Sequence, residues 1–321
     1  MTSSVIKQMK KIGNATLYCA DCKDVLPLLK DIDSCVTDPP YGLSFMGRQW
    51  DYDVPGVDIW AQIHDVLKPG SHLLSFFGSR TYHRGAIPIE DAGFEIRDQL
   101  MWLYGSGFPK SLNIGKAVDK LQGNEREVVG KRKAHDIRGN ALMEATVPEY
   151  KKEKSQIDIE ITKGNSEWEG WGTALKPAHE PIVMARKPLA GTVAQTVLDH
   201  GTGGINIDEC RVGENGGTTK KEFLDKDSKT VYGDGLNGSF GIPIDKGRYP
   251  ANVMHDGSEE VQKIFPNTKS GSIKEGTKQG FGNASANVYG KSVGVTGATR
   301  PASEGTAARY FYCAKASKKD R

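Results

Sequence analysis

The residues best suited to chemistry in this sequence are the five in the stretch Thr37-Asp38-Pro39-Pro40-Tyr41. Two consecutive prolines fix the backbone angle φ and carry no N–H, so the carbonyl groups beside them are held still. A carboxylate oxygen of Asp38 and the carbonyl oxygen of Pro39 could then accept two hydrogen bonds from one NH2 group, while Tyr41 offers a flat ring face. The stretch predicts a site for a planar heterocycle with an exocyclic amine. A plain proline turn after a core strand is the alternative.

The stretch resembles the DPPY signature of DNA amino-methyltransferases, which transfer a methyl group from S-adenosyl-L-methionine to adenine N6 or cytosine N4. The order of the chain resembles the permuted (β) group of that family, of the phage or restriction-modification type. The resemblance implies a Rossmann-like α/β sheet, double-stranded DNA as the partner, extrusion of the target base, and a cytoplasmic location in a bacterial host cell. Asp38, Pro39, Pro40 and Tyr41 are then the catalytic residues, and Asp38 also faces the cofactor. Asp in the first position favours adenine, with cytosine left open.

Residues outside the signature also resemble the family. Asp21, followed by Cys22, resembles the acidic residue that contacts the cofactor near its adenine or ribose. A carboxylate at a strand end can accept hydrogen bonds from ribose hydroxyls, and a helix N-cap is the alternative role for Asp21. Phe108 is the candidate for the second wall of the base pocket, with packing on the sheet edge as its alternative. His179-Glu180 resembles a family pattern too, and we interpret it as structural.

Two basic segments are candidates for contact with DNA. The loop 42–55 mixes aromatic residues with Arg48, which suits a segment that closes on DNA and contacts a phosphate; a loop packed on its own small core is the alternative. Lys131, Arg132 and Lys133 lie in a charged tract that is either a solvated face or a phosphate-binding surface.

Composition sets only broad limits on function. The 321 residues are 37% hydrophobic and 26% charged, and the net charge of +3 permits a polyanionic partner without requiring one. No apolar run approaches the roughly 18 residues of a membrane span. Five cysteines without a signal peptide indicate reduced thiols in the cytosol. Cys19 and Cys22 form a C-x-x-C, but Cys19 falls in a predicted strand, so buried thiols are favoured over a metal site.

Strands and helices alternate along the first half of the chain. We predict strands at 15–20, 32–36, 71–77, 94–104 and 177–185, and helices at 23–30, 57–67, 81–93 and 112–121. This alternation indicates a parallel α/β sheet, with Asp38 at the carboxyl end of its strand. Further along we expect helices near 192–199 and 258–264, strands near 205–207, 251–254 and 309–314, and a loop or linker over 266–306.

The expected domains follow from this order. They are a catalytic core at 1–121 and 175–188, a charged insertion at 122–174, and a target-recognition region at 189–321. The glycine-rich strand-to-helix loop with which the family binds its cofactor has no counterpart in these 321 residues. Three alternatives follow: an enzyme completed by a second polypeptide that supplies the loop, a DNA-binding remnant without activity, or a chain that binds cofactor weakly through Asp21 and the signature alone.

Overall fold

The computed structural model divides the chain into two compact units. Unit 1 comprises Met1–Ser106 with Ala178–Arg321, and unit 2 comprises Gly107–Pro177. The described residues are 6, 8–44, 47, 49–107, 109, 111–135, 156–213, 218–223, 239–243, 246–270, 278–280, 293–295 and 302–313. Among them, no helix is both long enough and apolar enough to cross a membrane.

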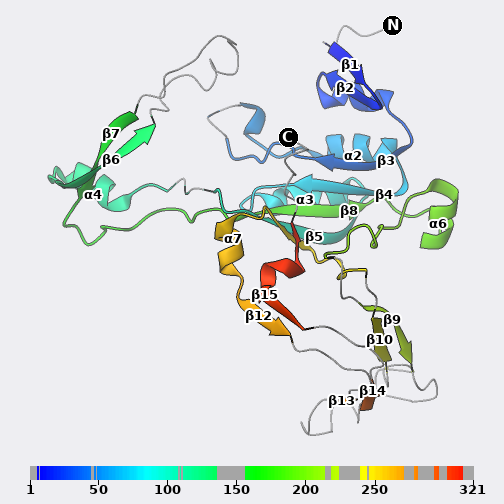
Figure 1. Cartoon of the computed structure of the whole chain (residues 1–321). Helices are drawn as coiled ribbons and strands as arrows, with labels where there is room; N and C mark the ends of the chain where they lie inside the picture. Colours follow the sequence, from blue (N-terminus) through cyan, green and yellow to red (C-terminus); the bar gives the residue numbers. More distant parts are fainter. Residues whose placement is uncertain are drawn as a thin grey trace. The chain divides into compact units, whose positions relative to one another are not determined.

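Unit 1 is built around a six-stranded sheet with the strand order β16-β11-β5-β8-β4-β3 (Figure 1). The strands are β3 (Ile32–Thr37), β4 (Leu67–Phe76), β5 (Glu95–Leu103), β8 (His179–Arg186), β11 (Val253–His255) and β16 (Tyr312–Cys313). The α/β class predicted from the sequence is confirmed, as are the strand that carries the signature and its parallel pairing with β4.

One strand runs against the others, so the prediction of an all-parallel sheet is wrong. β8 is antiparallel to both of its neighbours, β4 and β5. The cause is the connection: β5 ends at Leu103, and the chain returns at the same edge of the sheet, where His179 pairs with Leu103. A strand that re-enters where the previous one left must run back along it. Its apolar centre, Ile182-Val183, is buried.

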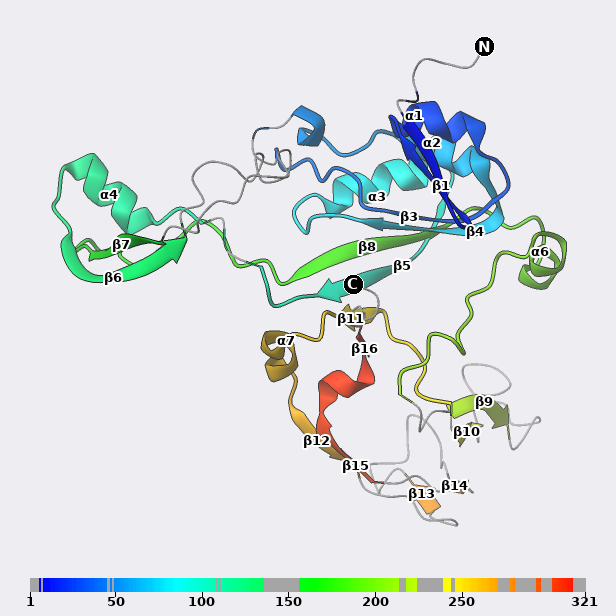
Figure 2. The same ribbon diagram turned by 45° about the horizontal axis from the view of Figure 1, so that its top comes forward.

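The main core of unit 1 lies between this sheet and two helices. They are α2 (Val57–Val66) and α3 (Tyr82–Asp91). Figures 1 and 2 show both on the same face of the sheet. Trp60 and Ile63 of α2 are three residues apart, so they share a helix face, and both are buried. They belong to one cluster with Leu73 of β4 and with Phe77, the residue that follows β4. Phe77 extends the core to the carboxyl edge of the sheet.

The N-terminal segment lies outside the six-stranded sheet. Its elements are β1 (Gln8–Ile12), β2 (Ala15–Cys19), α1 (Cys22–Val25) and η1 (Leu26–Leu28). The strand predicted at 15–20 is confirmed, but the helix predicted at 23–30 is short and gives way to a 3-10 turn that contains Pro27. Among the described residues, β1 and β2 pair only with each other, and the residues of both strands are all exposed. The expectation of a buried thiol at Cys19 is therefore wrong, and Cys22 is exposed too.

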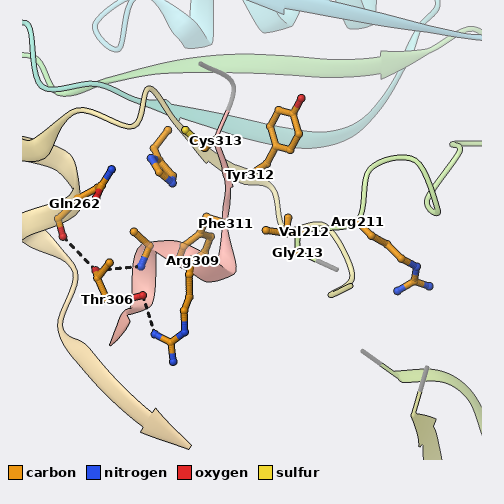
Figure 3. Close-up of a pocket in the computed structure, with 11 residues that line it drawn as sticks. Arg211, Val212, Gly213, Gln262, Thr306, Arg309, Phe311, Tyr312 and Cys313 are labelled. Carbon is orange, nitrogen blue, oxygen red and sulfur yellow. Dashed lines mark hydrogen bonds between the residues drawn. The ribbon is translucent and has the colours of Figure 1, made fainter. Parts of the chain in front are cut away.

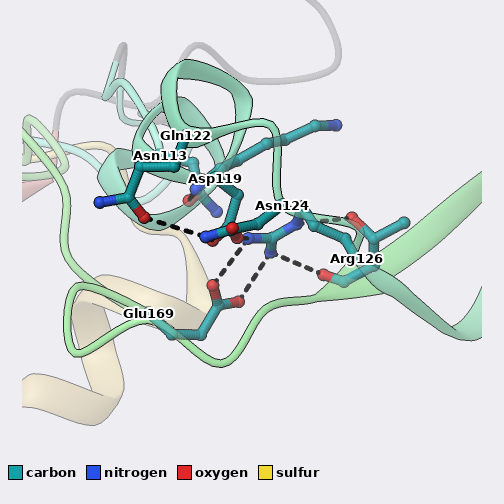
Figure 4. Close-up of polar contacts among 8 residues, drawn as sticks. Asn113, Asp119, Gln122, Asn124, Arg126 and Glu169 are labelled. Atoms are coloured by element: carbon teal, nitrogen blue, oxygen red, sulfur yellow. Dashed lines mark hydrogen bonds and ion pairs between the residues drawn. The ribbon is translucent and has the colours of Figure 1, made fainter.

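Unit 2 joins a helix to a two-stranded hairpin. Its elements are α4 (Ile114–Gln122), β6 (Glu127–His135) and β7 (Gln156–Lys163), so the helix predicted at 112–121 is confirmed. Arg126 lies at the centre of the polar network in Figure 4. Its guanidinium donates to the buried carboxylate of Asp119, to both carboxylate oxygens of Glu169 at 3.0 and 2.9 Å, and to Thr162. This network ties the helix, the hairpin and the following turn together.

The rest of unit 1 consists of short elements. They are α6 (Val193–His200), β9 (Thr218–Phe223), β10 (Ser239–Pro243), α7 (Glu259–Ile264), β12 (Asn267–Ser270), β13 (Lys278–Gly280), β14 (Val293–Val295), β15 (Ser303–Thr306) and η4 (Ala307–Tyr310). Both predicted helices and the strand near 251–254 are confirmed. The strand near 205–207 is wrong, because Ile207 N–H donates to the Ile205 carbonyl at 2.9 Å in a tight turn. Within 266–306, β12 pairs with β15, and β13 with β14.

Candidate active site

Asp38 follows β3 at the edge where the parallel strands β3, β4 and β5 end. Its carboxylate is exposed, and the Tyr41 hydroxyl donates to its Oδ1 at 2.7 Å. The Tyr41 ring is half-buried, with its centroid 6.5 Å from that of Phe77. Burial, the hydrogen bond to Asp38 and the charge of Glu180 all raise the pKa of Tyr41. The phenol therefore stays protonated at neutral pH and orients the carboxylate.

A second carboxylate, Asp51, fixes the backbone at the end of the signature by hydrogen bonds. It ends the 3-10 turn η3 (Gln49–Asp51) and is 3% exposed. Its Oδ1 accepts from the backbone N–H groups of Tyr41 at 2.8 Å and Gly42 at 3.0 Å. Gly42 has a φ of +66°, and a Cβ there would lie 3.1 Å from Val54 N. No sequence pattern indicates this role, because Asp51 is distinguished from the exposed Asp53 only by how the loop folds.

Glu180 and Tyr104 lie at the same rim of the sheet. Backbone hydrogen bonds on either side of Glu180 fix its strand: Phe77 N–H donates to the Pro181 carbonyl, and Tyr104 N–H donates to the Ala178 carbonyl, both at 3.0 Å. Burial first, and then the negative charge of Asp38, raise the pKa of Glu180. Burial and the charge of Glu180 raise the pKa of Tyr104. These mutual effects place both residues in one electrostatic cluster with Asp38 and Tyr41.

Asp21 has the local role of a helix cap. Its Oδ1 accepts from Lys23 N–H at 2.9 Å at the start of α1, and its side chain is exposed. Burial, followed by the charge of Asp21, raises the pKa of the Cys22 thiol. Among the described residues, no group of three or more His, Cys, Asp or Glu side chains could hold a metal ion.

The residues predicted to contact DNA and the base are only partly described. Arg48 and Phe108 lie outside the described residues. Lys131, Arg132 and Lys133 lie in β6 of unit 2, and all three are exposed. In the hairpin register Lys131 is opposite Glu160, Lys133 opposite Asp158, and Arg132 opposite Ile159. Acidic neighbours across the hairpin therefore offset two of the three cations.

A cavity of about 450 Å³ lies elsewhere in unit 1, beside β16 and η4 (Figure 3). Arg309, which lines it, donates from its guanidinium to the backbone carbonyls of Gly305, Thr306 and Thr268 and lies over the Tyr310 ring. Its hydrogen bonds hold the 3-10 helix to β12 and β15. None of the predicted catalytic, cofactor or base-binding residues lines this cavity.

Comparison with known proteins yields only distant structural matches. No family model and no curated protein matches the chain. The solved complex of M1.HpyAVI with SAM is 14% identical, with a TM-score of 0.24, over 52% of this chain and 50% of that one. TTHA0409 from Thermus thermophilus, provisionally described as a DNA modification methylase, is 16% identical, with a TM-score of 0.26, over 54% of each chain. The chain spans about half the length of these structures, and such values establish neither a family nor an activity.

Proposed function

We propose that the chain acts in site-specific DNA methylation, transferring a methyl group from S-adenosyl-L-methionine to adenine N6 after the base is flipped out of the duplex. The observation that supports this proposal is the arrangement of groups around Asp38, at the edge of the sheet where β3, β4 and β5 end. An exposed carboxylate, oriented by the Tyr41 hydroxyl at 2.7 Å, follows the edge strand β3 and is succeeded by two prolines. These groups suit an exocyclic amine, which needs two fixed hydrogen-bond acceptors.

The protein groups act on the amine by orientation and electrostatics. Tyr41 donates to Oδ1 of Asp38, and Oδ2 has no hydrogen-bond partner among the described residues, so it can accept from one amine proton. The Pro39 carbonyl accepts the second amine proton. An amine held this way is pyramidal, with its lone pair free to attack a methyl group, although conjugation with the ring otherwise makes it a poor nucleophile. Pro40 keeps the Pro39 carbonyl fixed.

The charges at this rim fit the proposed cofactor. S-adenosyl-L-methionine supplies an electrophilic methyl group on a positively charged sulfur. The exposed carboxylate of Asp38 suits a cation, and the carboxylate of Asp21 has a second oxygen that can accept from ribose hydroxyls while the first caps α1. Cys22 lies beside Asp21 as an exposed, protonated thiol. In this proposal Asp21, Cys22 and Asp38 hold the cofactor.

The proposal includes contacts with double-stranded DNA. Base flipping is needed because a duplex hides the amine in a base pair. Phe108 and Tyr41 would flank the flipped base, and Arg48 with the exposed cations of β6 would contact phosphates. Cytosine N4 is the alternative target, because its amine offers the same two protons.

The sheet edge favours a second candidate, in which a second polypeptide completes the site. Among the described residues β3 pairs only with β4, so its other edge is unpaired. Val36 on this strand is 66% exposed. The unpaired edge of a sheet accepts another strand readily. A partner that added strands there would lie beside Asp38 and could supply the glycine-rich loop. Without it, the chain would bind DNA and leave it unmethylated.

The test is transfer of tritiated methyl groups from S-adenosyl-L-methionine to unmethylated duplex DNA, with the methylated nucleoside identified by chromatography. We expect N6-methyladenine, and we expect Asp38→Ala to lower the rate by about 100-fold or more. Asp33→Ala is the matched control, because Asp33 is an exposed residue of the same strand. Full activity of Asp38→Ala would refute the site. Salt-dependent DNA binding without transfer would favour the inactive DNA-binding chain.

A further inference from the structure

We propose that Glu180 determines which bases the candidate site accepts, by donating a hydrogen bond from its carboxyl group to the ring nitrogen beside the amine. The amine itself is received by Asp38. This inference rests on the proposed function, because it requires a base to enter with its amine at Asp38. It adds the class of base: one in which an NH2 group stands beside an unprotonated ring nitrogen on the Watson–Crick edge.

The strand registers put Glu180 on the same side of the sheet as Asp38. Extending the β3–β4 register by one residue makes Asp38 level with Phe76, which is level with Ile182 of β8. Side chains two residues apart on a strand share a face, so Glu180 shares the face of Ile182 and stands one step nearer the rim. With β4 between them, the two strands are about 10 Å apart. The two side chains stand on this face on either side of β4, and in this proposal the base binds across them.

The groups around Glu180 determine which carboxyl carries a proton. Asp38, Tyr41 and Tyr104 are the titratable groups that interact with it, from the end of β3, the following loop and the end of β5. Burial and the negative charge of Asp38 raise the pKa of Glu180 and so favour its protonated form. Tyr41 donates to Oδ1 of Asp38, so Asp38 already acts as a hydrogen-bond acceptor. Among the described residues the Glu180 carboxylate accepts no hydrogen bond and forms no ion pair, so its proton is not displaced.

Asp38 as the acceptor and a protonated Glu180 as the donor give the rim one acceptor and one donor. Adenine and cytosine each present an NH2 donor next to a ring-nitrogen acceptor on the Watson–Crick edge, which matches this pair. In guanine the NH2 group stands next to an N–H donor on that edge, and thymine has no NH2 group, so neither base offers the same pair. A base that leaves the half-buried Glu180 without a hydrogen-bond partner binds more weakly, so this arrangement discriminates between the two classes of base.

The test measures equilibrium binding of nucleosides to the full chain by ligand-observed NMR. Adenosine is compared with 1-deazaadenosine, which lacks the ring nitrogen, and cytidine with 3-deazacytidine. We expect the wild type to prefer the natural nucleoside by about tenfold at pH 6, since one hydrogen bond is at stake. This preference should fade as the pH rises and Glu180 ionises. Glu180→Ala should lose the preference at every pH. Glu180→Gln should keep it without the pH dependence, because an amide N–H donates at any pH.

A second comparison separates this inference from the proposed function. Purine riboside lacks the amine, so Asp38→Ala should abolish the preference for adenosine over purine riboside. If Asp38→Ala does so while Glu180→Ala keeps the wild-type preference over the deaza analogue, the role of Glu180 is overturned and the proposed function stands. If Asp38→Ala changes nothing, or the wild type binds no nucleoside at millimolar concentration, both are overturned. Thermal melting confirms that each variant is folded. If Glu180→Ala does not fold, the loss of pH dependence in Glu180→Gln is the test.

Discussion

Replacing Asp51 by alanine should release the signature from the loop that holds it. Asp51 is 3% exposed, and its Oδ1 accepts two backbone N–H groups, those of Tyr41 at 2.8 Å and Gly42 at 3.0 Å. Hydrogen bonds to a charged group contribute about 1.5–3 kcal/mol each. The two bonds share one acceptor and their donors are only half-buried, so the sum is reduced, and we expect Asp51→Ala to lower the free energy of unfolding by about 2–4 kcal/mol.

Urea unfolding followed by tryptophan fluorescence measures this loss, and the near-ultraviolet circular dichroism of the folded variant reports on the Tyr41 environment. Asp51→Asn keeps an acceptor oxygen and should lose less than half as much. Asp53→Ala is the matched control from the same loop, because exposed Asp53 forms an ion pair with Arg84 and accepts from the backbone N–H of Val54 at 2.8 Å, and neither contact involves the signature. Such a pair contributes at most about 1 kcal/mol. If Asp51→Ala unfolds no more easily than Asp53→Ala, Asp51 does not hold the signature.

Two further substitutions test the packing of each unit. Gly85→Ala would place a Cβ against the ring of the buried Phe77 and should lower the free energy of unfolding in urea by about 1–3 kcal/mol. Gly204→Ala is the control and should be close to neutral, because a Cβ there has only an ordinary contact at 3.8 Å. Equal effects would show that Phe77 moves aside freely. Arg126→Met leaves the buried Asp119 without its cation, so chymotrypsin should cleave residues 107–177 of the full chain about tenfold faster. Cleavage no faster than in the exposed-site variant Lys120→Met would refute that role.

Local patterns predicted the elements that depend on local chemistry. The strand before Asp38, the helix α2 and the helix α6 all follow from short apolar patterns with clear ends, and Thr192 caps α6 by accepting from Gln195 N–H at 3.1 Å. The sequence could not show the direction of β8, because that direction is set by where the chain re-enters the sheet. Nor could it show that Cys19 is exposed, since this depends on β2 pairing only with β1.

The candidate site also contains residues that the sequence could predict and residues that only the structure reveals. Asp38 and Tyr41 stand out by type and spacing within one short stretch, and the structure joins them by a hydrogen bond. Asp51 is recognised only through its burial and the two backbone N–H groups from which it accepts. The sequence does single out Glu180, beside His179, but its place on the face of Asp38 follows only from the strand registers. Their contributions arise from tertiary contacts, so an acidic residue of the same type elsewhere in the sequence looks identical. The roles of all four in methylation remain predictions.

The segment that forms unit 2 leaves and re-enters the sheet of unit 1 at neighbouring positions. β5 stops at Leu103 and β8 starts at His179, and these two residues are partners in one antiparallel ladder. Partner residues in such a ladder lie about 5 Å apart, a gap that a short turn can close. Unit 2 is therefore an exchangeable module: evolution can lengthen, shorten or replace it without altering the strands on either side. Both of its attachment points are on the edge of the sheet that carries Asp38.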